Sequence, residues 1–233
     1  MEQAMKKVPS RQVEPAACAR RDEILDAATA LFAERGYAGT DTQSLADVLQ
    51  VGKGTIYRYF PSKRELFLAT VDRVMRRLRA EVDASTVGVE DPLDRIAQAV
   101  RTYLAFFAEH PEFVELLIQE RAYFKDRKKP TYFEHREQNV QRWRELFRSL
   151  IAEGRVRDVP VERITDVLTN SVYGTMFTNY FTGPSKPFEE QARDILDILY
   201  HGVLSETERR RSQSESAAIR GAREITGPSL DQG

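Results

Sequence analysis

The strongest constraint on the fold is the stretch 40–63, which holds two short helical patterns separated by a very short connection. Residues 50–52 lie between the patterns and are too few for anything but a tight turn. Thr40, with Gln43 three residues on, has the form of a capping box that starts the first helix, and Pro61 ends the second. The residues expected to face inward are Leu45, Val48, Leu49, Ile56 and Phe60. The stretch therefore predicts two tightly connected helices.

Apolar residues recur at helical spacing on both sides of this stretch. Upstream, a stripe from Ile24 to Phe32 ends at Gly36, a residue that can adopt a positive φ. Downstream, Ser62 and Glu65 form a second capping box. The helix that it opens has on one face Phe67, Val71, Val74 and Leu78. Similar stripes predict helices near 92–109, 111–124, 132–152 and 160–181, and a last one with Ile195, Ile198, Leu199 and Val203. With no strand alternation and no internal repeat, the sequence predicts an all-α fold of about nine helices.

Charge and composition divide the chain into parts. Residues 1–80 contain 14 Lys and Arg against 10 Asp and Glu, a net charge of +4, although the whole chain has a net charge of −1. A break at 84–91, followed by Pro92 at a helix N1 position, predicts a boundary between modules at 20–80 and 91–205. The polar arm 1–19 and the Arg-, Glu- and Ser-rich tail 206–233 are expected to be disordered.

Several functional classes lack support in the sequence. Cys18 is the only cysteine, so neither an intramolecular disulfide nor a Cys-based metal site is expected, and the three scattered histidines lack metal-ligand spacing. We find no Ser/His/Asp order and no phosphate-binding Gly loop, and we therefore predict no catalytic residue, no metal and no cofactor. No apolar run approaches the roughly 18 residues of a membrane span, and no signal peptide is recognisable, which predicts a cytoplasmic protein.

The segments RRDEILDAATALFAERGYAGT and SLADVLQVGKGTIYRYFPSKRELF resemble the TetR/AcrR family of bacterial transcriptional regulators. The resemblance implies a three-helix DNA-binding domain with its helix-turn-helix at about 43–62, a helical effector-binding domain and a homodimer. It usually means a repressor that a small molecule releases from DNA. Two residues depart from the family: many relatives have Gly at Gln50 and Ser at Gly52. Either Gln50 tolerates a positive φ, or the turn is made differently.

In a helix-turn-helix, the second helix enters the major groove with its N-terminal residues against base edges. The candidates for base contact are therefore Lys53, Gly54 and Thr55. The candidates for phosphate contact are Thr40, Thr42, Gln43, Tyr57, Arg58, Tyr59 and Lys63. The alternative for the tyrosines is packing, and for Arg58 it is a solvated face. Lys63 is poorly placed for the dipole of its own helix, and a nearby phosphate would compensate.

The second module is rich in aromatic residues, which suits either an ordinary core or a pocket with apolar walls and a few polar anchors. We expect an apolar or aromatic effector. The candidate pocket residues are Tyr103, Phe107, His110, Leu117, Glu120, Arg121, Phe124, Trp143, Phe147, Asn170, Tyr173 and Phe177.

Small residues in the helix 160–181 suit close helix packing, either within the chain or across a dimer. The resemblance favours a two-fold dimer built from the last two helices. The candidate interface residues are Ser171, Gly174, Thr175, Thr178, Ile195 and Leu199. Such a dimer would read a palindromic operator. A repressor that needs a corepressor, an activator, and a small-molecule-binding protein with a vestigial DNA motif remain alternatives.

Overall fold

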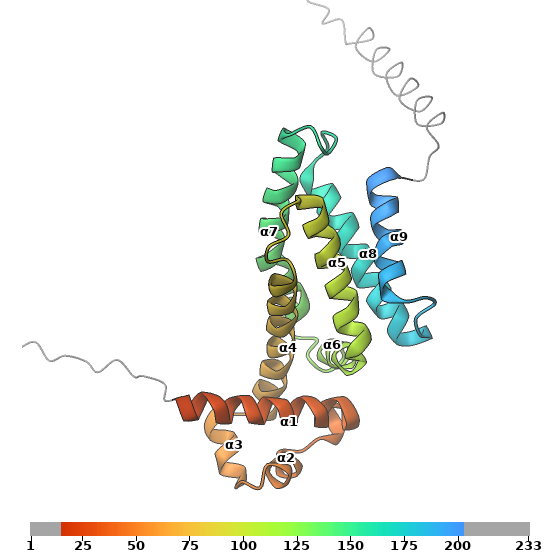
Figure 1. Cartoon of the computed structure of the whole chain (residues 1–233). Coiled ribbons are helices and arrows are strands. Elements are labelled where there is room, and N and C mark those ends of the chain that lie inside the picture. The colour runs from red at the N-terminus through yellow and green to blue at the C-terminus, as the bar shows by residue number, and fades with distance from the viewer. Residues whose placement is uncertain (1–14, 203–233) are drawn as a thin grey trace, which may run out of the picture. The chain divides into compact units, whose positions relative to one another are not determined.

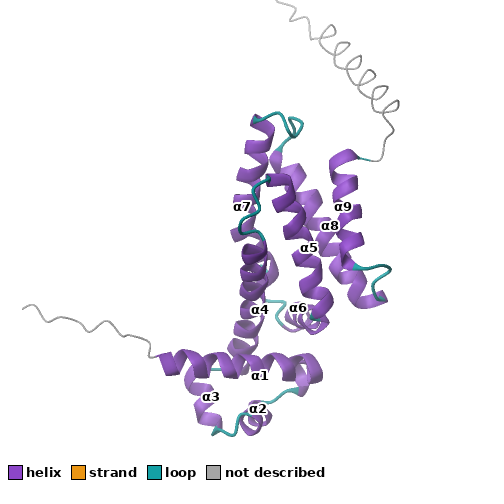
Figure 2. Ribbon diagram, viewed as in Figure 1, coloured by secondary structure: helices purple, strands orange, loops and turns teal. Residues whose placement is uncertain are grey.

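The computed structural model describes residues 15–202 and contains, in that range, nine α-helices and no strand (Figures 1 and 2). The all-α prediction is confirmed. The helices are α1 (Pro15–Gly39), α2 (Thr42–Val48), α3 (Lys53–Tyr59), α4 (Lys63–Ser85), α5 (Pro92–Glu109), α6 (Pro111–Tyr123), α7 (Thr131–Ala152), α8 (Val161–Thr182) and α9 (Phe188–His201). Most of the arm and tail expected to be disordered, the side chain of Cys18, and Val203 lie outside the described residues. The chain forms two compact units, residues 1–192 and 193–233.

Helix α1 begins at Pro15, ahead of the start expected near residue 20, and it is kinked at Gly36. Gly36 has φ 72° and ψ 166°, so the expected positive φ is confirmed, but helical structure resumes as far as Gly39. A kink disturbs the regular backbone hydrogen bonds around it. The side-chain amide of Gln119, on α6, bridges this point: it accepts from Tyr37 N at 2.8 Å and donates to Phe32 O at 3.2 Å.

The start of α2 differs from the predicted capping box. Asp41, not Thr40, is the N-cap, and its carboxylate accepts from Ser44 N at 2.8 Å. The Thr40 hydroxyl lies in the core within 3.0 Å of the carbonyl oxygens of Leu31 and Gly36, so it has no role at the cap. Asp41 is the better cap because its carboxylate reaches the unpaired amides of the first turn.

The inward face of α2 also differs in part. Leu45 is buried as expected, but the side chain of Val48 is 59% exposed, and Ala46 is buried instead. Helix α2 packs on α1 and α3, and a helix of seven residues with two neighbours leaves its remaining face to solvent. The expectation that Val48 faces inward was therefore wrong.

Helix α4 connects the N-terminal helices to the rest of the first unit. Its predicted start is confirmed, because the Ser62 hydroxyl accepts from Glu65 N at 3.1 Å. The face predicted from the sequence is buried throughout, at Phe67, Val71, Val74 and Leu78. Helix α4 packs against α1, α5, α6 and α7. Figure 1 shows α2 and α3 on one side of α1, and α5 to α8 on the other.

One hydrophobic core crosses the boundary predicted at 84–91. Its buried residues run from Ile24 on α1 through α2 to α6 and include Met176 on α8. The ring of Phe124, at the end of α6, lies 4.9 Å from that of Tyr37 and 5.4 Å from that of Phe67. The N-terminal helices therefore share their core with α5 and α6.

Candidate nucleic-acid interface and effector cavity

The turn between α2 and α3 closes with two backbone hydrogen bonds. Gln50 N donates to Asp47 O at 3.2 Å, and Val51 N donates to Ala46 O at 2.9 Å, the pattern of a Schellman motif. This motif requires a left-handed residue, and Gln50 supplies it with φ 53°. Of the two possibilities left open by the sequence, Gln50 thus tolerates the positive φ.

Helix α3 presents its first turn to solvent. Gly52 is the N-cap without a side-chain hydrogen bond; Lys53 and Gly54 are exposed, and Thr55 is half-buried. Ile56 and Phe60 are buried as predicted and hold the helix against its neighbours. The three candidates for base contact therefore share one accessible helix end, which is the geometry that a groove-reading helix needs.

The candidates for phosphate contact lie around this end and differ in their exposure and in their hydrogen bonds. Arg58 and Gln43 are exposed, and the Gln43 amide donates to Asp47 Oδ1 at 2.8 Å. The hydroxyls of Thr42 and Tyr57 lie 3.0 Å apart and connect α2 to α3. Tyr59 is half-buried, with the Arg58 guanidinium 5.2 Å from its ring centroid. Thr40 is buried, so its side chain does not lie on this surface.

Lys63 has protein partners beside the interface. Its Nζ lies 4.5 Å from the centroid of the Tyr37 ring and 3.4 Å from Ala38 O. Partial burial lowers the pKa of the Lys63 ammonium, while the Asp41 carboxylate acts in the opposite direction. The ring, the carbonyl and the carboxylate offset the unfavourable position of a cation at a helix N-terminus.

A cavity of about 150 Å³ lies between α4, α5, α7 and α8. Three of the residues predicted for an effector pocket line it, namely Tyr103, Trp143 and Phe147. The other lining residues are Met75, Leu78, Arg79, Val82, Ile96, Ala99, Val100, Tyr132, His135, Arg136, Asn139, Val140, Arg142, Thr165, Leu168, Thr169 and Val172. Its walls are mostly apolar, with a few polar groups, as in small-molecule sites.

The remaining pocket candidates lie elsewhere. Phe107, Leu117 and Phe124 are buried in the shared core, and Tyr173 and Phe177 pack against it. Arg121 and Asn170 are exposed. His110 joins α5 to α6 beside a second, more polar pocket of about 770 Å³; its ring nitrogens lie 3.1 Å from Glu112 Oε1 and 3.0 Å from a nitrogen of Arg77.

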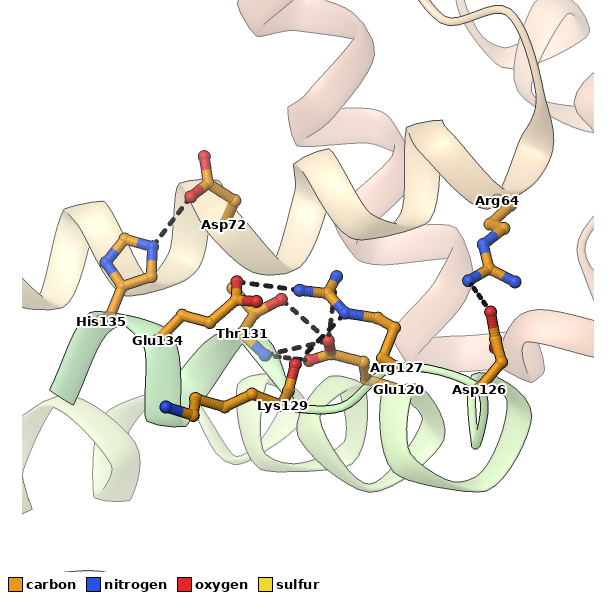
Figure 3. Close-up of polar contacts among 9 residues, drawn as sticks. All are labelled: Arg64, Asp72, Glu120, Asp126, Arg127, Lys129, Thr131, Glu134 and His135. Carbon is orange, nitrogen blue, oxygen red and sulfur yellow. Dashed lines mark hydrogen bonds and ion pairs between the residues drawn. The ribbon is translucent and has the colours of Figure 1, made fainter. Parts of the chain in front are cut away.

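Two polar pairs lie at the cavity wall. The hydroxyls of Tyr103 and Tyr132 are 2.8 Å apart, and burial raises the pKa of Tyr103 well above its ordinary value and that of Tyr132 to about 12. His135 Nε2 lies 2.8 Å from Asp72 Oδ1, which connects the wall on α7 to α4 (Figure 3). Sequence reasoning missed Tyr132, His135 and Asn139, although polar side chains spaced three and four residues apart along α7 were a signal for them.

Glu120 organises the loop between α6 and α7 (Figure 3). This buried carboxylate accepts from Thr131 N at 3.0 Å and from the Thr131 hydroxyl at 2.8 Å, and Arg127 lies 3.3 Å away. It thus caps α7, whose N-cap Pro130 has no capping side chain. The same loop carries Asp126, which pairs at 2.5 Å with Arg64 in the first turn of α4.

The candidate dimer residues on α8 lie partly on one exposed face. Gly174 and Thr178 are exposed, and a side chain at Gly174 would meet open space. The exposed apolar residues Val167 and Phe181 continue this face. Ser171 and Thr175 are half-buried, as are Ile195 and Leu199, which belong to the unit 193–233.

Two kinds of feature are absent from the described residues. No helix there is long and apolar enough to cross a membrane. No group of three or more His, Cys, Asp and Glu side chains in that part of the chain could hold a metal ion.

Two family models match the chain. The model for bacterial regulatory proteins of the tetR family matches residues 24–70, and that for the tetracyclin repressor-like C-terminal domain matches residues 89–203. Among curated proteins, the chain is 39% identical over 77 residues to the HTH-type transcriptional repressor KstR of Mycobacterium tuberculosis, covering 33% of this chain and 35% of KstR. The chain spans about a third to a half of the length of the first curated relatives it matches.

Solved structures share the fold over most of the chain. The regulator FadR from Bacillus subtilis, in complex with stearoyl-CoA, is similar with a TM-score of 0.67 and 16% identity over 78% of this chain and 99% of that one. AibR, in complex with isovaleryl coenzyme A and operator DNA, has a TM-score of 0.59 and 21% identity over 78% of this chain and 98% of that one. At these identities the likeness concerns the fold.

Proposed function

Because the chain belongs to the TetR family of bacterial regulatory proteins, we propose that it is a dimeric transcriptional regulator that binds a palindromic operator and is released from it by a small molecule. Such a regulator acts in the cytoplasm, where bacterial DNA lies. KstR and FadR, to which the chain is similar, are transcriptional regulators, and we propose no enzymatic activity for this chain.

The exposed first turn of α3 is the observation that carries this proposal. Lys53 and Gly54 are accessible there, and Ile56 and Phe60 fix the helix from behind. Lys53 can donate to guanine acceptors in the major groove, Thr55 can meet a base or a thymine methyl, and Gly54 permits close backbone approach. Arg58, Gln43, Tyr57 and Tyr59 surround this end, and we propose that they contact phosphates.

A gel shift with the DNA upstream of the gene for this protein tests the proposal. We expect Lys53→Ala to cost about 1–3 kcal/mol of operator binding and to relax the preference at one or two base pairs. Arg157→Ala, in the loop between α7 and α8, removes an exposed positive charge away from α3 and serves as the control. Loss of binding in the control equal to that in Lys53→Ala, or unchanged binding in Lys53→Ala, would contradict the assignment.

We place the effector in the cavity between α4, α5, α7 and α8. Residues of α4 form part of its wall, and the hydrogen bond between His135 and Asp72 connects α7 to the same helix. Only three residues separate the end of α3 from the start of α4, so a displacement of α4 would change the spacing of the two recognition helices in a dimer. A coupling free energy of about 1–3 kcal/mol would suffice for release. The complexes of FadR and AibR with acyl coenzyme A ligands support a ligand site in this fold.

The direction of the ligand effect distinguishes the variants of this function. A ligand that binds the protein and weakens the gel shift supports a released repressor. One that strengthens the gel shift indicates a corepressor, and one that binds without changing the gel shift contradicts the proposed coupling.

A further inference from the structure

The apolar cavity also constrains the chemistry of its ligand. We infer that the ligand is a compact anion, with an apolar part about the size of one six-membered ring joined to a carboxylate. This inference rests on the proposed function, because it names the class of effector for the same cavity.

The size of the cavity limits the apolar part. Its volume is about 150 Å³, similar to that of an engineered protein cavity that binds benzene. Sites for drug-sized ligands are about 300–1,000 Å³. A single ring or a short branched chain therefore fills this space, whereas most of a long acyl chain would extend outside it.

The charged residues of the wall are of one sign. Arg79, Arg136 and Arg142 line the cavity, and none of the lining residues is an Asp or a Glu. The carboxylates that pair with these arginines lie outside the wall, and Asp83 pairs with both Arg79 and Arg142. Because one carboxylate serves two guanidinium groups, the wall keeps an excess of positive charge that an anionic ligand would balance.

Arg136 is the best placed of the three to meet a ligand. Its ion pair with Asp166 is long at 3.5 Å, and its side chain is more buried than that of Arg142. It lies on α7 one turn from Tyr132, whose hydroxyl adds a neutral hydrogen-bonding group to the same wall. A carboxylate could therefore exchange with Asp166 at Arg136 without leaving the guanidinium unpaired.

Two buried polar atoms of lining residues lack hydrogen-bond partners among the described residues. They are Arg142 Nε, a donor, and Asn139 Oδ1, which belongs to an amide that can rotate to present its NH₂ group. Buried polar groups are normally paired, so unpaired ones at a cavity indicate a missing partner. An anionic oxygen accepts from Arg142 Nε directly and from the Asn139 amide once that amide has rotated, whereas a hydrocarbon satisfies neither.

Isothermal titration calorimetry without DNA tests this inference with three probes: benzoate, its neutral isostere benzamide, and stearate. We expect benzoate to bind about tenfold or more tightly than benzamide, because charge-assisted hydrogen bonds are stronger than neutral ones. Stearate should bind more weakly than benzoate.

Variants on α7 assign the effect to the cavity. Arg136→Gln should remove the preference for the anion over benzamide, and Arg136→Lys should retain part of it. Arg148→Gln is the matched control, since Arg148 lies on the same helix, is exposed and does not line the cavity. Benzamide binding as tightly as benzoate, tighter binding of stearate, no binding of benzoate, or an equal effect of Arg148→Gln would overturn the inference. Failure of the gel shift with ligand-free protein would instead count against the proposed DNA binding.

Discussion

Gln50 shows how a single side chain can sit in an unfavourable conformation at the centre of a functional motif. Its φ of 53° closes the Schellman turn between α2 and α3. The left-handed region costs an L-residue roughly 1–2 kcal/mol, and glycine avoids this cost but loses about 0.5–1 kcal/mol through its greater freedom in the unfolded chain.

We therefore expect Gln50→Gly to raise the free energy of unfolding by up to about 1 kcal/mol, measured by urea denaturation. Gln50→Ala is the control, since alanine keeps the Cβ that causes the strain. A Gly variant less stable than the wild type, or an Ala variant that gains as much, would show that Gln50 is not strained.

The buried Tyr132 is a second single residue with a testable consequence, because it should make the free energy of unfolding depend on pH. Burial raises its folded-state pKa to about 12, from an ordinary value of 10.0. The folded state therefore holds the phenol proton more tightly than the unfolded state. The associated stability is complete below pH 10 and is lost between about pH 10 and 12, at a slope of about 1.4 kcal/mol per pH unit.

Tyr132→Phe should make the decline of the unfolding free energy with pH shallower across this window. The slope should change by about 1.4 kcal/mol per pH unit, which corresponds to one proton. Urea denaturation at a series of alkaline pH values measures the slope. A slope identical to that of the wild type would show that Tyr132 does not hold its proton more tightly when folded.

At the scale of elements, local patterns predicted the helices well but not all of their neighbours. Apolar spacing identified the buried face of α4, and Pro92 correctly marked the start of α5 after its Asp91 cap. The prediction that Val48 faces inward was wrong because the exposure of a helical residue depends on which helices pack beside it. The sequence contains no local signal for that information.

The pocket candidates show the same limit. Tyr103, Trp143 and Phe147 line the cavity, while Phe124 packs against Tyr37 and Phe67. All four are aromatic residues in helical patterns, so composition cannot separate cavity wall from solid core. Their positions depend on long-range packing between helices.

Gln119 is an interhelical contact that no local pattern indicated. Its buried amide accepts a hydrogen bond from Tyr37 N and donates one to Phe32 O, across the kink of α1. Its Nε2 also donates to the Glu115 carboxylate. The same carboxylate accepts a short hydrogen bond from the hydroxyl of Tyr180 on α8. These bonds join α8, α6 and the kink of α1, just ahead of α2 and α3.

We expect Gln119→Met, which keeps the approximate shape but removes the amide, to lower the free energy of unfolding by about 1–3 kcal/mol, because buried backbone groups at the kink lose their partners. Denaturant titration measures this change, with Gln138→Met at an exposed position of α7 as the control. Equal stability of both variants would show that solvent replaces the Gln119 amide without cost.

At the scale of the whole molecule, the exposed face of α8 predicts the assembly. Thr178 lies on it with Gly174, and Phe181 is 67% exposed nearby. We propose that a second copy covers this face. Thr178→Arg would place a large charged side chain in such an interface and should yield monomers in analytical ultracentrifugation, with weaker operator binding.

Ser149→Arg, a comparable change at an exposed site on α7, should leave the assembly unchanged. Near-wild-type thermal stability of the monomer fold would separate loss of the dimer from misfolding. A Thr178→Arg protein that still sediments as a dimer would exclude this face as the interface.

The core shared by α1 to α6 has a consequence for how the protein can be divided. A fragment ending near residue 80 would lose Phe106, Phe113 and Phe124, which complete the packing of its own helices, and would expose their apolar partners to water. We therefore expect that α1 to α3 do not fold as an autonomous unit. Evolution or engineering that exchanges effector modules between such proteins must carry α6 together with α1, or redesign the surface where they meet.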